Sequence, residues 1–314
     1  MGRFVLRRLL AAIPTLFLVS LITFGLLWLV PGDPASMFLD TSATAEALAR
    51  VRTQLGLDRP FLERMADWYV RLLRGDLGNS LLLNRTVASA IWERLPVTLS
   101  LTGMAFAFAV LLGVAAGVVA AVRHGRMADQ GMMALALLGL SIPEFWLGLV
   151  LVWLVAVLVP LFPPGDYVAF AQSPVQWLHH IALPAFTLAC VQMGFVARMT
   201  RSSMLEVLGQ DFVRTARAKG LPELYVVLRH GLANAMVPIV TVMGIMVGAL
   251  LGGAVVIEQV FSIPGMGRLI IGAVLSRDFP VIQGGLLFLA VIYLAVNLVV
   301  DLLYAAIDPR VRLE

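Results

Sequence analysis

Long apolar stretches, separated by short polar segments, run through most of this sequence. A helix needs about 20 mostly apolar residues to cross the hydrocarbon core of a bilayer, which is about 30 Å thick. Six stretches meet this requirement or come close to it: 9–30, 97–122, 132–159, 181–196, 236–257 and 284–304. The fourth is the shortest and contains Pro184. The pattern therefore predicts an all-α integral membrane protein with about six transmembrane helices.

The first stretch follows three arginines, as the apolar part of a signal peptide would. It is too long for a signal peptide, and Pro31-Gly32-Asp33 follows it instead of a small-x-small cleavage site. We interpret it as an uncleaved anchor. The chain then has three regions. Residues 1–30 form the N-terminus and first transmembrane helix, 31–96 an extracytoplasmic helical segment, and 97–314 a core transmembrane domain with a cytoplasmic loop at 198–235.

The basic residues of the short loops indicate the orientation, because cytoplasmic loops carry an excess of Lys and Arg. With the N-terminus inside, the inner segments hold thirteen Lys and Arg residues and the short outer loops hold two. The long segment 31–96 holds eight arginines and eight acidic residues, and long loops cross largely regardless of charge. We therefore expect both termini in the cytoplasm.

The outer segment 31–96 shows helical periodicity in two places. One helix is expected over 44–55. A second starts after Pro60, with an apolar stripe of Phe61, Met65, Trp68 and Leu72. The segment could dock an external partner, or it could be a helical hairpin on the membrane surface. Both interpretations remain open, and they are compatible.

The cytoplasmic loop combines an apolar stripe with a basic face. The pattern predicts two short helices joined at Gly209–Gln210, the second ending near Gly220 because Pro222 blocks continuation. The stripe consists of Leu205, Leu208, Phe212, Val213 and Ala216, and the basic face of Arg214, Arg217 and Lys219. Lipid headgroups, the protein's own helix ends or a soluble partner could cover the apolar side. Periodicity does not choose among them.

Two features inside the spans could line a pathway. Glu144 lies in the third span beside Pro143, and a charged group at bilayer depth costs about 2.5–3.5 kcal/mol, so it normally faces a cavity or a partner. The alternative is a neutral Glu144 bound to backbone groups that Pro143 frees. Gly244, Gly248 and Gly252 share one face of the fifth span, where ordinary helix packing is the alternative to a pathway.

Composition excludes several other classes of protein. Hydrophobic residues make up 60% of the chain and charged residues 13%, whereas a soluble domain carries about 25% charged residues. The net charge of +4 includes no basic run that would indicate nucleic acid. The single cysteine, Cys190, cannot form an internal disulfide or a zinc site. The adjacent His179 and His180 point different ways on a helix, and we expect no metal site and no cofactor.

Motifs for ATP binding or catalysis are also absent from the sequence. The only lysine, Lys219, precedes Gly220, so a G-x-x-x-x-G-K-[ST] phosphate-binding loop cannot occur. Neither His-Glu-x-x-His nor Gly-x-Ser-x-Gly occurs. Three interpretations remain: a permease driven by a separate ATPase, a secondary transporter, and a membrane enzyme. The amphipathic cytoplasmic loop favours the first, since it offers a surface to a soluble partner.

Motifs along the whole chain identify a family that this sequence resembles. They include Pro31-Gly32-Asp33-Pro34, Leu55-Gly56-Leu57-Asp58, Gly75-Asp76-Leu77-Gly78, Ser141-Ile142-Pro143, the block 198–220, Pro264-Gly265 and Asp308-Pro309-Arg310. The sequence resembles the dipeptide/oligopeptide/nickel family of ABC-transporter permeases, specifically the subunit type with the large first periplasmic loop. The resemblance implies the transmembrane domain of a type I ABC importer.

The resemblance also implies roles and partners. Residues 215–220 stand where such permeases carry a Glu-Ala-Ala…Gly signature, although the glutamate and first alanine are absent here. This short coupling helix would sit in a groove of an ATPase subunit, with Phe212, Val213 and Ala216 filling the groove and charged residues on its rim. The residues implied in ATPase coupling are Glu206, Asp211, Phe212, Arg214, Ala216, Arg217, Lys219 and Gly220.

The implied protein is one permease subunit of a binding-protein-dependent importer in the bacterial inner membrane. Its implied partners are a second homologous permease, one or two ATP-binding subunits and an extracytoplasmic solute-binding protein. It would not be an enzyme itself, since its partners would hydrolyse ATP. Short peptides are the expected substrate, and nickel complexes or glutathione are the alternatives within the family. A secondary transporter is the alternative of a different class.

Overall fold

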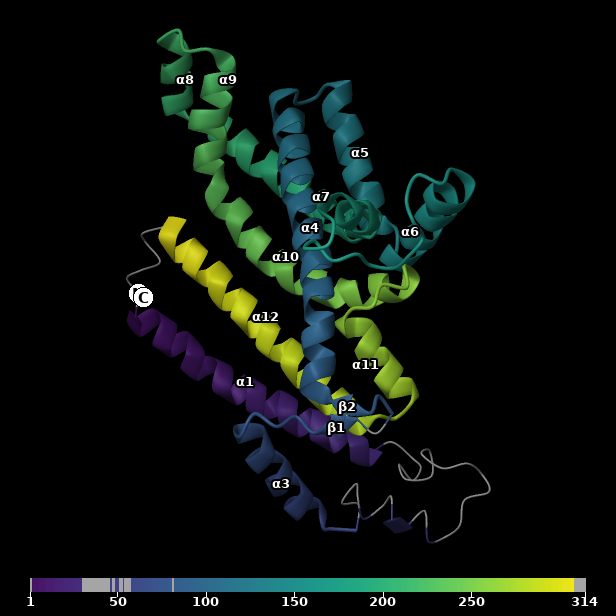
Figure 1. The fold of residues 1–314 in the computed structure, drawn as a ribbon. Coiled ribbons are helices and arrows are strands. Elements are labelled where there is room, and N and C mark those ends of the chain that lie inside the picture. Colours follow the sequence, from purple (N-terminus) through teal and green to yellow (C-terminus); the bar gives the residue numbers. More distant parts are fainter. Residues whose placement is uncertain are drawn as a thin grey trace. The chain divides into compact units, whose positions relative to one another are not determined.

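A computed structural model describes residues 2–29, 46, 49–50, 53, 58–80 and 82–307, and these are mostly helical (Figure 1). Contacts divide the chain into two compact units. One contains 97–264 and the last part of the chain from residue 295. The other contains 2–96 and 265–294. Two helices, α4 (Val87–Val122) and α12 (Phe279–Ile307), contribute residues to both units.

Among the residues that the structure describes, five helices are long and apolar enough to cross a membrane: Val5–Gly25, Val87–Val122, Pro174–Leu208, Glu223–Val260 and Phe279–Val300. A bent pair, Met127–Ser141 with Glu144–Leu158, can supply a sixth span. The prediction of about six transmembrane helices is therefore confirmed.

The third predicted span, 132–159, is wrong as a continuous helix. Helix α5 (Met127–Ser141) ends and α6 (Glu144–Leu151) begins after a bend of 104°. Ile142 and Pro143 between them have extended backbone angles, with ψ of 126° and 133°. Proline cannot donate a backbone hydrogen bond and disfavours the helical conformation in the residue before it, so the chain turns here although its hydropathy is unbroken.

The fourth predicted span, 181–196, is much longer than expected. Helix α7 (Pro174–Leu208) runs through it and through the first helix predicted for the cytoplasmic loop. Ser173 caps its start, since its hydroxyl accepts a hydrogen bond from the Gln176 amide at 3.3 Å. The remaining elements of this unit are the π-helical segment η2 (Val152–Leu158), α8 (Asp211–Ala218), α9 (Glu223–Tyr225), the π-helical segment η3 (Val226–Leu232) and α10 (Ala233–Val260).

Helices α4, α7 and α10 supply most of the core of this unit. Its fully buried side chains include Leu101, Ile181, Leu188, Leu250 and Ile257. Glycines let the backbones approach closely. A Cβ on Gly117 of α4 would lie 2.6 Å from the Ala197 carbonyl oxygen, and one on Gly194 of α7 would lie 2.5 Å from the Ala136 carbonyl oxygen. Both positions therefore exclude larger residues.

The second unit contains α1 (Gly2–Leu29), α3 (Phe61–Leu73), a small hairpin, the start of α4, α11 (Met266–Leu275) and the start of α12. Strands β1 (Asn79–Ser80) and β2 (Arg85–Thr86) pair antiparallel, Asn79 opposite Thr86. Helix α3 begins after Pro60 as predicted, and its Trp68 packs against Phe24 of α1 with ring centroids 5.7 Å apart. Most of the helix predicted over 44–55 lies outside the described residues.

Asp278 ties the hairpin to the start of α12. It is 2% exposed and accepts a hydrogen bond from the Ser80 hydroxyl and another from the Val281 amide. Its other carboxylate oxygen has no hydrogen-bond partner among the described residues. Burial raises the pKa of Asp278, although both hydrogen bonds act in the opposite direction.

Candidate functional site

The coupling helix predicted from the sequence is α8. The expected junction at Gly209–Gln210 is present, since α7 ends at Leu208 and α8 begins at Asp211. Asp211 lies in the first turn, where the helix dipole favours a negative charge, and it pairs with Arg214 at 2.6 Å. Gly220 follows with φ of +76°, a left-handed conformation that glycine adopts without strain, so the chain can turn into α9.

The apolar face of α8 is covered by this chain itself. Val213 and Ala216 are 0% and 6% exposed and pack with Val226, against Val207 and Leu208 at the end of α7. Sequence reasoning left the cover of this face open and, from the resemblance, placed Val213 and Ala216 in a partner's groove. In this structure the two side chains instead pack within the chain itself.

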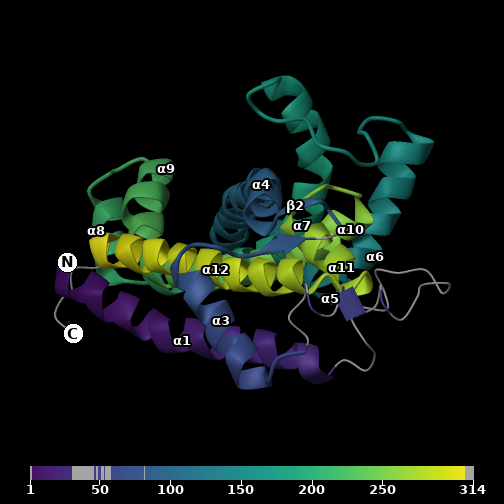
Figure 2. The same cartoon turned by 60° about the horizontal axis from the view of Figure 1, so that its bottom comes forward.

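The opposite side of this region presents exposed apolar and charged groups. Phe212 is 45% exposed, and Leu224 and Tyr225 of the adjacent α9 are 71% and 50% exposed. Arg217 pairs with Glu223 at 2.8 Å across the turn between α8 and α9, which lie side by side (Figure 1 and Figure 2). Glu206, Arg214, Lys219 and Gly220 are also exposed. The structure thus gathers the predicted coupling residues, Ala216 excepted, on one accessible end of the unit.

Glu144 lies at the start of α6, immediately after the bend. A Cβ on Gly253 of α10 would lie 2.6 Å from its Oε2 atom and 2.8 Å from Leu188 Cδ1. No hydrogen bond or ion pair of this carboxylate occurs within the described part of the chain, so the alternative of a Glu144 bound to backbone groups near Pro143 is not supported there. Gly253, which sequence reasoning did not single out, makes room for the carboxylate.

The three glycines predicted on one face of α10 have different surroundings. Gly244 is buried, and a Cβ there would lie 2.6 Å from Val300 Cγ1, so it serves close helix packing. Gly248 is half-buried. Gly252 is exposed and a Cβ there would meet nothing within 4 Å. Packing therefore explains Gly244, and Gly248 and Gly252 stay as predicted pathway positions.

His179 and His180 bind separate backbone oxygens. His179 Nε2 is 2.6 Å from the Leu161 oxygen, and His180 Nδ1 is 2.8 Å from the Gln176 oxygen. Among the described residues no group of three or more His, Cys, Asp or Glu side chains could hold a metal ion.

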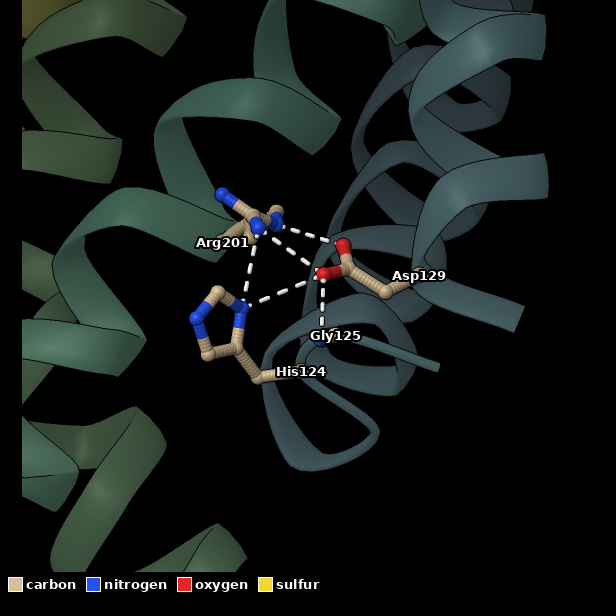
Figure 3. Close-up of polar contacts among 4 residues, drawn as sticks. All are labelled: His124, Gly125, Asp129 and Arg201. Atoms are coloured by element: carbon tan, nitrogen blue, oxygen red, sulfur yellow. Dashed lines mark hydrogen bonds and ion pairs between the residues drawn. The ribbon is translucent and has the colours of Figure 1, made fainter. Parts of the chain in front are cut away.

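A polar cluster that sequence reasoning missed joins α5, α7 and the turn after α4 (Figure 3). Asp129 is 3% exposed and accepts hydrogen bonds from Arg201 Nε at 2.6 Å, Arg201 Nη2 at 2.8 Å and the Gly125 amide at 3.0 Å. His124 Nδ1 lies 3.1 Å from the carboxylate and 3.0 Å from Arg201 Nη2. The two charges are 72 residues apart in sequence, and no local pattern pairs them.

Comparison with known proteins identifies the family. Residues 113–313 match the family described as binding-protein-dependent transport system inner membrane component, and 1–102 match the N-terminal family of the same membrane component. The chain belongs to this family of ABC importer permeases. This permease is thus a multi-pass inner-membrane subunit that works with an ATPase and a binding protein, and ATP hydrolysis takes place in the separate ATPase.

Relatives of similar length support the assignment. The permease is 47% identical over 314 residues, 100% of both chains, to a protein of Brucella abortus (strain 2308) named as a peptide transport system permease. It is 44% identical over 312 residues, 99% of both chains, to the glutathione transport system permease protein GsiC of Escherichia coli (strain K12).

A solved structure shows the same fold. The MetNI methionine ABC transporter, in an inward-facing conformation, matches with a TM-score of 0.55 and 20% sequence identity. The match covers 71% of the permease and 96% of that chain. The prediction of an ABC importer transmembrane domain is confirmed, and family membership decides against the secondary transporter and the membrane enzyme.

Proposed function

We propose that this permease receives the movement of its ATPase through α8 and the turn that follows it. The observation that carries the proposal is the division of α8 into two faces. Val213 and Ala216 fix the helix to the end of α7 and to Val226, so α8 cannot move without α7. Phe212 remains 45% exposed on the other side and is free to enter a groove of the ATPase.

The charged groups around Phe212 would form the rim of that contact. Arg214 and Arg217 already pair with Asp211 and Glu223 in exposed positions. Exposed pairs contribute about 0–1 kcal/mol, so they can exchange partners at little cost when the ATPase docks. Glu206 and Lys219 add further exposed charges at the same end.

The proposed assembly contains two homologous permease subunits, one or two ATP-binding subunits and an extracytoplasmic solute-binding protein. Both termini and α8 lie in the cytoplasm, as the distribution of basic residues indicates. The segment 31–96, including α3 and the hairpin, helps to seat the binding protein. Residues 97–314 supply the core and its coupling loop at 198–235.

Short peptides are the proposed substrate. The relatives that support this carry peptide transport and glutathione transport in their names, and glutathione is itself a small peptide. Nickel complexes are the less favoured alternative, since His179 and His180 each bind a different carbonyl oxygen. Glu144, Gly248 and Gly252 are the proposed contributions of this subunit to the translocation pathway.

Purification of the tagged permease from membranes of its native host tests the assembly. We expect a second permease and ATP-binding subunits to accompany it, and ATP hydrolysis to rise when a binding protein loaded with peptide is added. Recovery of the chain alone after gentle extraction would contradict the proposal. Stimulation by a nickel-loaded binding protein instead of a peptide-loaded one would replace only the substrate.

The variant Gly220→Trp tests the role of α8. A large side chain in this left-handed, exposed turn should disturb docking, so ATP hydrolysis should continue without import while the protein stays in the membrane. Gly131→Trp is the matched control, since Gly131 is also exposed and open but lies on α5. Normal import by the Gly220 variant would contradict the proposed role of α8 in coupling.

A further inference from the structure

The cluster of Asp129, Arg201 and His124 joins the start of α5, the last part of α7 and the turn after α4 (Figure 3). Arg201 approaches the buried carboxylate with two nitrogens, Nε on one oxygen and Nη2 on the other. Such a bidentate pair fixes direction as well as distance. It therefore joins α7 to the start of α5 in one defined geometry.

Arg201 and the coupling helix are linked by one continuous helix. Two turns beyond Arg201, the last residues of α7 pack onto α8 and η3. Leu208 contacts the cluster of Val213, Ala216 and Val226. A Cβ on Gly231 of η3 would lie 3.1 Å from Met204 Cε and 3.2 Å from Leu208 Cδ2. A displacement of α8 must therefore move the end of α7 that carries Arg201.

Beyond the ion pair, α7 is locked against both neighbouring helices. Gly117 places α4 against the Ala197 carbonyl, and Gly194 places the backbone of α7 against the Ala136 carbonyl of α5. These contacts resist sliding, because interfaces packed backbone to backbone lack side chains that could rearrange. Along α7, the Asp129–Arg201 ion pair lies closer to α8 than these two glycine contacts do.

We propose that Asp129 and Arg201 are positioning residues for energy coupling: they transmit the displacement of α8 and α7 to the α4–α5 pair. The inference rests on the proposed function of α8 as the ATPase contact. Without the pair, the end of α7 would still pack on Gly117 of α4 through Thr200 but would no longer hold the start of α5, so the ATPase cycle would switch the pathway incompletely.

His124 supports the pair in either of its neutral tautomers. A ring nitrogen that carries a proton donates, and one without a proton accepts. With a proton, Nδ1 donates to the Asp129 carboxylate 3.1 Å away; without one, it accepts from Arg201 Nη2 at 3.0 Å. The imidazole thus adds one hydrogen bond to the pair in either form. His124→Ala should therefore reduce coupling less than loss of Asp129 does.

The test uses the purified importer with its ATPase and binding protein in lipid nanodiscs, and in proteoliposomes for import. The variants are Asp129→Asn, Arg201→Lys, and Asp129→Asn combined with Arg201→Gln. The double variant leaves no uncompensated buried charge, so it should assemble even if the single Asp129 variant does not. Arg126→Gln, a charge change in the same turn outside the cluster, is the control.

We expect assembled variants to keep basal ATP hydrolysis while stimulation by the loaded binding protein falls by at least about fivefold, the lower end of usual couplings between sites. Import should fall in parallel, and Arg201→Lys should lie between the double variant and wild type. If the pair only stabilised the fold, its loss would lower the melting temperature or the yield but leave the stimulation per assembled complex unchanged. That result would overturn the inference, and so would normal import by the double variant. Absence of stimulation in the wild type would instead refute the proposed function.

Discussion

Gly117 offers a direct measure of how tightly α4 and α7 are joined. In the variant Gly117→Ala, the new Cβ would lie 2.5 Å from Thr200 Cβ and 2.6 Å from the Ala197 carbonyl oxygen. Ordinary contacts begin at 3.4 Å, so the helices must separate by about 0.9 Å. Neither obstacle is the flexible end of a side chain, and relief must come from the backbone.

The cost can be isolated with a second glycine on the same helix. A Cβ on Gly103 would meet nothing within 4 Å, so Gly103→Ala changes only helix propensity, a gain of about 0.5–1 kcal/mol. Gly117→Ala receives the same gain and adds an overpacking cost of about 1–3 kcal/mol. The difference between the two variants is therefore the packing cost alone.

Unfolding by sodium dodecyl sulfate in mixed micelles, followed by helical circular dichroism, measures this difference. We expect Gly117→Ala to unfold at a lower fraction of the denaturing detergent than Gly103→Ala, by an amount corresponding to about 1–3 kcal/mol. Equal stability of the two alanine variants would refute the reasoning, since it would mean that α4 and α7 separate without cost.

Three further predictions concern polar groups. Because the pKa of Asp278 is raised in the folded protein, its contribution to stability is full below the usual aspartate pKa and is lost as the pH rises through the raised value. Detergent unfolding across this range should show the loss in wild type and not in Asp278→Asn; parallel profiles would contradict the assignment. Arg217→Ala should change stability by less than about 1 kcal/mol, because its pair with Glu223 is exposed, yet reduce copurification of the ATPase. Unchanged copurification would remove Arg217 from the contact. Nickel ions should leave the melting temperature of the permease unchanged, and an increase that His179→Ala abolishes would show a metal site.

Hydropathy predicted most of the fold but not the ends of its helices. The fourth span was predicted to end at 196, whereas α7 continues to Leu208. In this continuation Arg201 pairs with Asp129 of another helix, a contact that no local pattern could predict. The bend after Ser141 was not predicted, although Pro143 is present in the sequence. The apolar stretch around Pro143 is unbroken, and it therefore suggested one continuous span.

In the coupling region, too, local features were predicted and contacts between distant segments were not. Periodicity identified α8, its apolar stripe and its ends, because these depend on neighbouring residues. It could not show that Val226 covers Val213 and Ala216, since that contact depends on how η3 folds back against α8. The place of Gly253 beside Glu144 also depends on two helices that are distant in sequence.

The pairing of Asp129 with Arg201 also sets an order of events during synthesis. Asp129 leaves the ribosome 72 residues before Arg201. At about 5–20 residues per second, roughly 4–14 seconds separate the two. During that interval the α4–α5 hairpin carries a carboxylate without its cation, so the turn must remain hydrated. Arrival of α7 supplies the cation, so the final hydrogen bonds of the hairpin form only after a later helix has been translated.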